Sequence, residues 1–218
     1  MRQTLRYSAI LLLGLVVLVG CEKKEKEPET PPPPPPPTAE QVRAELHNAA
    51  AKLWNPPVSQ ADAQTIASNL QPVLTTHRSG VNGPEGIGRF RKEVADLIES
   101  AAAQERYGVV YAAIIAYETI EPGSTLYNRR KQRALDVLNR PAVTCNGFLE
   151  TGGVLHVNLE VYDKQAKKTS SYNVREGDLF HNDTLQLIKV IGNQSEVQLK
   201  YLKTDDTWVV PGPKKRQR

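Results

Sequence analysis

Cysteine is scarce in this chain, which has only Cys21 and Cys145 among its 218 residues. Cys21 ends a signal-like segment and is expected to be acylated, so Cys145 would be the one remaining thiol. An intramolecular disulfide is then excluded. Cys145 lies in an expected strand entry, Val143–Gly147, where a free cysteine is usually buried and inert. The alternative, a reactive thiol, has no catalytic signature beside it.

Catalytic and metal-binding patterns are also lacking. The four histidines are dispersed, with no H-E-x-x-H or H-x-H spacing, and there is no G-x-S-x-G elbow. The glycine-rich stretch 79–88 lacks the order of a phosphate-binding loop and follows no predicted strand, so it is interpreted as a turn. Asp178 and Asp183 flank Phe180 and His181 and could hold a metal, but turn and strand positions explain them. We expect no enzyme activity, no metal and no cofactor.

Charge of one sign is not in large excess. The chain has 28 Lys and Arg against 24 Asp and Glu, and Arg2 and Arg6 belong to the N-terminal signal, so 26 basic residues remain. This small excess and export from the cytoplasm argue against a nucleic-acid partner. The length permits one or two domains, and a charged fraction of 24% argues against a polytopic membrane protein or a wholly disordered chain.

Residues 1–20 have the features of a secretory signal. Two arginines precede an apolar run from Ala9 to Val19, and small residues follow at the cleavage point. A transmembrane helix is the alternative, but this run is shorter than the roughly 20 residues that cross a bilayer. The signal peptide is therefore the better interpretation.

The sequence Leu18-Val19-Gly20-Cys21 resembles a bacterial lipobox. This resemblance implies that Cys21 becomes the first residue and carries several acyl chains, which together give stable membrane anchoring. The body of the protein would then lie in extracytoplasmic space as a lipoprotein of the bacterial cell envelope. Glu22 leaves open whether the inner or the outer membrane holds the anchor.

Residues 21–38 are expected to form a tether. The stretch Glu22–Thr30 is charged and has no apolar side chain to bury, and seven consecutive prolines follow from Pro31 to Pro37. Polyproline extends by about 3.1 Å per residue, or roughly 20 Å for seven residues. We interpret the run as a spacer. An SH3-type ligand is the alternative, but such partners are mostly cytoplasmic.

Apolar residues at helical spacing predict a helical domain over residues 39–140. Thr38 and Ser59 are expected to cap the first two helices, and Pro72 predicts a kink or an early end in the second. The stretch Tyr107–Tyr117 is apolar nearly all round and predicts a central buried helix. A further helix is expected over 87–104.

The last helix is expected to start with Ser124 as its cap and to run to about Asn139, with Leu126 facing inward. A basic face is expected on it, which most simply is a solvated face and alternatively attracts anionic lipid headgroups. The basic tail, residues 212–218, could likewise attract anionic lipid headgroups. The residues of the basic face are Arg129, Arg130, Lys131, Arg133 and Arg140.

Residues 141–211 are predicted to form a β-domain. Val157, Leu159 and Val161 alternate with polar residues, as a strand with one buried face requires. The expected strands are 147–150, 154–162, 170–175, 185–191, 196–202 and 207–210. The fold class is therefore α+β, an N-terminal helical domain followed by a small antiparallel β-sandwich or partly open barrel.

The β pattern resembles a known family. Tyr172–Phe180, with its Gly177-Asp178 turn, is followed by Leu185–Ile191 and Glu196–Lys200. This order is similar to the periplasmic β-domain shared by the PilP-like type IV pilus lipoproteins and the GspC proteins of type II secretion, and the lipobox and proline-rich tether match the PilP layout. PilP-like proteins usually have a largely unstructured region where this chain has residues 39–140.

The resemblance implies a membrane-anchored scaffold that docks on a secretin and on inner-membrane pilus or secretion assembly proteins. An unpaired strand edge around Tyr172, Val174, Gly177 and Asp178 is the candidate docking site. Two alternatives remain open. One is a lipoprotein that binds or processes peptidoglycan or another envelope ligand in a pocket between the two parts, and the other is a pilotin-like secretin chaperone.

Overall fold

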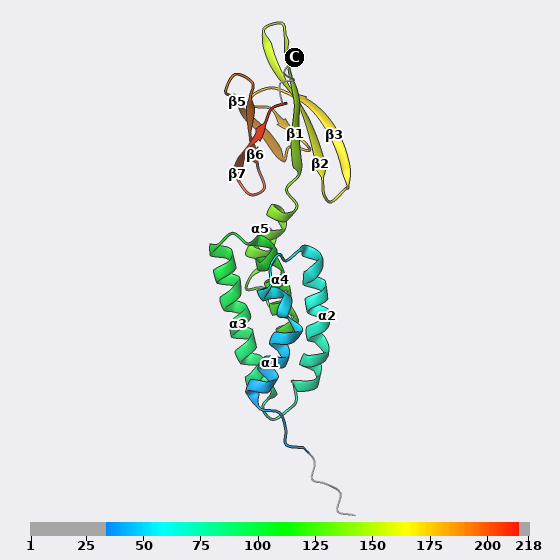
Figure 1. Ribbon diagram of the computed structural model, residues 1–218, viewed down its shortest axis with the longest axis vertical. Helices are drawn as coiled ribbons and strands as arrows, with labels where there is room; N and C mark the ends of the chain where they lie inside the picture. The colour runs from blue at the N-terminus through cyan, green and yellow to red at the C-terminus, as the bar shows by residue number, and fades with distance from the viewer. Residues whose placement is uncertain (1–33, 214–218) are drawn as a thin grey trace, which may run out of the picture. The chain divides into compact units, whose positions relative to one another are not determined.

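A computed structural model describes residues 34–213 of the chain. These residues form five α-helices followed by seven β-strands, so the fold is α+β with the helices N-terminal, as the sequence predicts (Figure 1). The signal segment, Cys21 and the basic tail from Lys214 to Arg218 lie outside the described residues. No helix within residues 34–213 is both long enough and apolar enough to cross a bilayer.

The first two helices begin at the predicted caps. The side chain of Thr38 accepts a hydrogen bond from the Gln41 backbone, and the Gln41 side chain accepts one from the Thr38 backbone. Ser59 and Asp62 form the same reciprocal arrangement. The helices are α1 (Ala39–Ala49), α2 (Gln60–His77), α3 (Gly83–Ala103), α4 (Tyr107–Ile120) and α5 (Asn128–Leu138), with a 3₁₀ turn at Ala51–Trp54.

The helical domain is built around α4. This helix packs against α2, α3 and α5, while α1 packs against α2 and α3. Because three neighbours cover α4, it needs apolar residues on nearly every side, which confirms the central buried helix. The buried members of this core run from Val42 to Ala134 and belong to helices α1 to α5 and the 3₁₀ turn, except Ala50, which lies between α1 and that turn.

Two local expectations for α2 and α3 differ from the structure. Pro72 does not end α2 early: the helix continues to His77, and Leu70, Leu74 and His77 on both sides of the proline are buried. The glycine-rich turn is in part helical, since α3 starts at Gly83. A proline in the first helical turn has no N–H to lose, so Pro84 permits this early start.

The start of α5 also differs from the prediction. The helix begins at Asn128 without a side-chain cap, so Ser124 is not its cap. Leu126 therefore lies in the preceding loop and is 68% exposed, although it was expected to face inward.

The β-domain contains two open antiparallel sheets and no closed barrel. The first has the order β1-β2-β3 and the second the order β4-β5-β6-β7. The sequence missed β4, which has only two residues and too little pattern to detect. The strands are β1 (Ala142–Thr151), β2 (Val154–Asp163), β3 (Lys168–Val174), β4 (Leu179–Phe180), β5 (Leu185–Ile191), β6 (Glu196–Tyr201) and β7 (Asp206–Pro211).

The two sheets share a second apolar core, and all its buried members come from the strands. Val157, Leu159 and Val161 of β2 are fully buried, which confirms the alternation read from the sequence. Cys145 of β1 belongs to the same core and is 3% exposed. Burial raises the pKa of its thiol, so the inert cysteine is the interpretation that the structure supports.

Candidate functional site

Strand β3 forms one edge of the three-stranded sheet. It pairs with β2 from Asp163↔Lys168 to Val157↔Val174, and no other strand forms a ladder with it. Within the described residues, no backbone hydrogen bond joins β3 to anything on its other side. The side chains of Thr169, Ser171 and Asn173 are exposed on the outer face. An extended segment could therefore add to this edge through main-chain hydrogen bonds.

Two of the four predicted edge residues, Tyr172 and Val174, lie on β3 with their side chains turned inward. Val174 is 5% exposed. The Tyr172 hydroxyl lies 3.2 Å from Nδ1 of His181, and its ring packs 5.5 Å from the ring of Phe180. These two side chains hold β3 on the core, so a partner at this edge would meet the backbone and the outward side chains instead.

The other two predicted residues, Gly177 and Asp178, lie beyond the edge, in the turn before β4. The Gly177 N–H donates to the Leu187 carbonyl, and the Leu187 N–H donates to the Asp178 carbonyl. The side-chain amide of Gln186 donates to the Gly177 carbonyl. Since these backbone groups already have partners within the domain, this turn offers no free edge. Its Asp178 carboxylate accepts the Arg175 N–H at 2.9 Å.

A second open edge lies at the end of the β1–β2 hairpin, and sequence reasoning missed it. Strand β2 pairs with β1 from Val154 onward, but with β3 only from Val157 onward. The hairpin consequently projects past the end of β3 (Figure 1). Gly152 and Gly153 both have positive φ, which a two-residue hairpin turn demands. The glycine pair was visible in the sequence, but the length mismatch between the strands was not.

This open edge borders a groove of about 490 Å³. Gly153, Val154 and Leu155 of the hairpin line one side, and Arg175, Glu176 and Asp178 of the turn after β3 line the other. Val154 is 41% exposed, and nearby on the hairpin Leu149 is 58% exposed. The groove thus combines apolar side chains, an unpaired strand segment and charged side chains.

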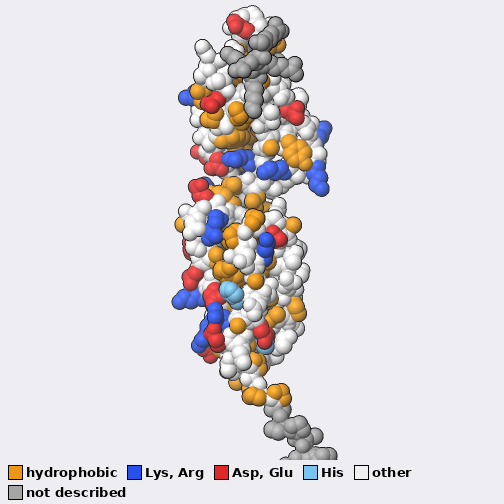
Figure 2. Space-filling view, viewed as in Figure 1, with side chains coloured by type: hydrophobic (Ala, Val, Ile, Leu, Met, Phe, Trp, Pro, Cys, Tyr) orange, Lys and Arg blue, Asp and Glu red, His pale blue; other side chains and the backbone are white. Residues whose placement is uncertain are grey.

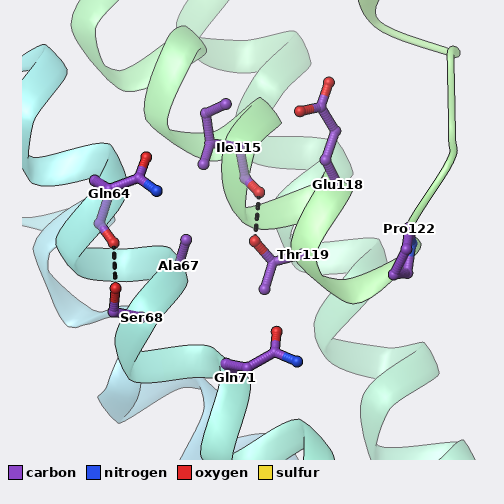
Figure 3. Close-up of a pocket in the computed structure, with 8 residues that line it drawn as sticks. All are labelled: Gln64, Ala67, Ser68, Gln71, Ile115, Glu118, Thr119 and Pro122. Atoms are coloured by element: carbon purple, nitrogen blue, oxygen red, sulfur yellow. Dashed lines mark hydrogen bonds between the residues drawn. The ribbon is translucent and has the colours of Figure 1, made fainter.

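A separate groove of about 500 Å³ lies between α2 and α4 (Figure 3). Its hydroxyl groups are committed to their own helices, since Ser68 donates to the Gln64 carbonyl at 2.9 Å and Thr119 to the Ile115 carbonyl at 2.8 Å. The Glu118 carboxylate pairs with Lys131 at 2.6 Å. The groups left for a ligand are mainly the carboxamides of Gln64 and Gln71, which do not form a catalytic arrangement.

The basic residues of α5 are partly neutralised by acidic partners. Arg130 pairs with Glu99 of α3, and Lys131 pairs with Glu118 of α4. Arg130 still lies on an outward, solvated face, since its side chain is 44% exposed. On the face of the helical domain drawn in Figure 2, Lys and Arg side chains likewise lie beside Asp and Glu side chains. Arg129 and Arg133, which are exposed, have no such acidic partner among the described residues.

Two of the four histidines, His77 and His181, are buried and form local pairs with structural roles. His77 is 8% exposed and its Nε2 lies 2.7 Å from the Glu45 carboxylate, which joins α2 to α1. His181 is also buried, between the Tyr172 hydroxyl and the Asp163 carboxylate, whose Oδ2 is 3.6 Å from Nε2. No groove described above includes any of these histidines, so substrate access to them is not indicated.

Within residues 34–213, no three His, Cys, Asp or Glu side chains gather closely enough to hold a metal ion. Asp178 and Asp183 therefore do not form such a group with His181. Comparison with known proteins adds no identity: no family model matches the sequence, and no curated protein or solved structure matches it. The resemblance to PilP-like and GspC-type β-domains stays a prediction.

Proposed function

We propose that this protein is a lipid-anchored scaffold of an envelope-spanning machine, and that its β-domain docks on a partner protein by strand addition. The observation that carries the proposal is the free edge of β3, with no second ladder partner in the described residues. The partners proposed from the sequence resemblance are a secretin and the inner-membrane proteins of a type IV pilus or a type II secretion system. Cys21 would supply the anchor, and no catalytic step is involved.

The register of the sheet indicates which backbone groups are available to a partner. The two-residue turn makes Thr151↔Val154 the first bonded pair, and bonded pairs alternate along antiparallel strands. By this alternation Val157 and Val174 form a bonded pair. The pair Glu160↔Ser171, three positions further along, is then not bonded, so Ser171 directs its N–H and C=O away from β2. A proline at position 171 would remove an outward N–H without removing a ladder bond.

The test uses the full chain, tagged at Arg218 and extracted from bacterial envelopes in detergent, with bound proteins identified by mass spectrometry. We expect recovery of a secretin or pilus inner-membrane proteins with the unaltered chain and with Ser171→Ala, which keeps the N–H. Ser171→Pro should lose them, and Cys21→Ser should recover less. Recovery of no machine component, or equal recovery with Ser171→Pro, would overturn the proposal.

A further inference from the structure

We infer that the groove at the β1–β2 hairpin is a second peptide-binding site, which takes a short extended segment carrying apolar residues and a basic residue. This inference does not depend on the β3 edge or on the identity of the envelope machine. It rests on the position of the groove, on the backbone groups that border it, and on the charges that line it.

The backbone of Leu155 provides the main-chain contacts. Bonded pairs alternate from Thr151↔Val154, so the pair Glu150↔Leu155 is not a bonded one. The N–H and C=O of Leu155 consequently point away from β1, toward the line that β3 would occupy if it were longer. Strand β3 ends at Val174, so a segment that enters the groove can continue that line beside Leu155.

The segment that follows β3 does not fill this position. After Val174 it turns at Gly177, whose φ is +88°, and its backbone pairs with Leu187 of β5 instead. Apolar contacts in the groove would come from Val154 and Leu155, which line it together with Gly153. The vacant strand position and these apolar side chains fit an extended segment with alternating apolar residues.

The charges of the groove favour a basic side chain in the bound segment. Two carboxylates, from Glu176 and Asp178, face one guanidinium, from Arg175. Asp178 uses Oδ2, which accepts the Arg175 N–H at 2.9 Å and lies 3.6 Å from the Arg175 Nε, so this carboxylate is already paired with the one guanidinium of the groove. Glu176 uses only Oε1, which accepts the Val190 N–H at 2.6 Å. Glu176 has no cationic partner in the groove, so its second oxygen is the main acceptor for a Lys or Arg of the ligand.

The experiment uses phage-displayed random seven-residue peptides, selected on the full chain in detergent. We expect enrichment of proline-free peptides with alternating apolar residues and a Lys or Arg. A synthetic copy of an enriched peptide should shift the backbone amide resonances of Val154 and Leu155. Glu176→Gln keeps an oxygen for the Val190 N–H but removes the charge, and it should weaken binding at least fivefold, as about 1 kcal/mol of charge attraction implies.

Glu176→Lys should change the selected peptides from basic to acidic, while Glu196→Gln, at an exposed carboxylate that does not line the groove, should leave affinity unchanged. Three results would overturn the inference: no enrichment, resonance shifts confined to β3 or to the α2–α4 groove, or unchanged affinity in Glu176→Gln. Because the assay requires no secretion or pilus protein, its outcome is separate from that of the envelope pull-down.

Discussion

Gly86 of α3 lies against Val42 of α1, so close that a β-carbon on the glycine would stand 2.7 Å from the Val42 β-carbon. The same added atom would lie 2.6 Å from the Ala39 carbonyl oxygen. The glycine therefore allows α1 and α3 to pack together. This contact gives the glycine-rich stretch 79–88 a role in helix packing.

Replacing Gly86 should accordingly destabilise the helical domain, whereas its neighbour Gly88 should tolerate a side chain. We expect Gly86→Ala to lower the free energy of unfolding by about 1 to 3 kcal/mol through overpacking. Gly88 has nothing within 4 Å of an added β-carbon. Gly88→Ala should stabilise the helix by up to about 1 kcal/mol. Urea unfolding followed by circular dichroism measures both, and equal effects would contradict the proposed packing role.

Pro72 lies inside α2 and leaves the carbonyl four residues earlier, that of Ser68, without its helical N–H donor. Pro72→Ala should restore that bond and raise the free energy of unfolding by about 1 to 3 kcal/mol. The unfolded chain of this variant is more flexible, which offsets part of the stabilisation. Pro84→Ala is the matched control, because Pro84 lies in the first turn of α3 and should give a change near zero. A destabilised Pro72→Ala protein would show that the proline is favourable here.

Cys145 should react slowly with thiol reagents in the folded protein. Its side chain is buried in the β-domain core, and burial raises the pKa of the thiol, which lowers the fraction of reactive thiolate. In a Cys21→Ser chain, modification by a chromogenic disulfide at pH 8 should be at least tenfold slower in buffer than in urea. Similar rates in both solvents would show that the thiol is accessible.

Asp163 should make stability depend on pH in the acid range. The N–H groups of Ala166 and Gln165 donate to its carboxylate, and His181 and Lys203 add positive charge, so the pKa is lowered in the folded protein. The stabilisation is then present above the unfolded pKa, near 4, and is lost as the pH falls through the lower folded value.

Asp163→Asn keeps an acceptor oxygen but not the charge. The difference in urea midpoint between this variant and the wild type should be largest near pH 6 and should shrink toward pH 2.5. A difference that stays constant across this range would refute the role of the charge. Glu150→Gln, at an exposed position of the hairpin, serves as the control for a general change in net charge.

Much of the fold could be predicted from local patterns. The caps Thr38 and Ser59 and the buried helix at Tyr107 were readable because each depends on a few neighbouring residues. The start of α3 at Gly83 was not, because a glycine-rich sequence is compatible with both turn and helix until α1 packs against it. The candidate site was predicted only in part: β3 is an edge, but Gly177 and Asp178 are paired with β5.

The sequence by itself determined the succession of helices and of every strand except β4, the alternation along β2 and the caps Thr38 and Ser59, since periodicity and hydrogen bonding over three or four residues specify them. The tertiary structure alone decided which edges stay open. Whether β3 ends before the β1–β2 hairpin, and whether the backbone after Val174 pairs with Leu187, depends on contacts between segments that are distant in the chain. Strand pairing is a long-range property, and an unpaired edge is visible only after every other pairing has been made.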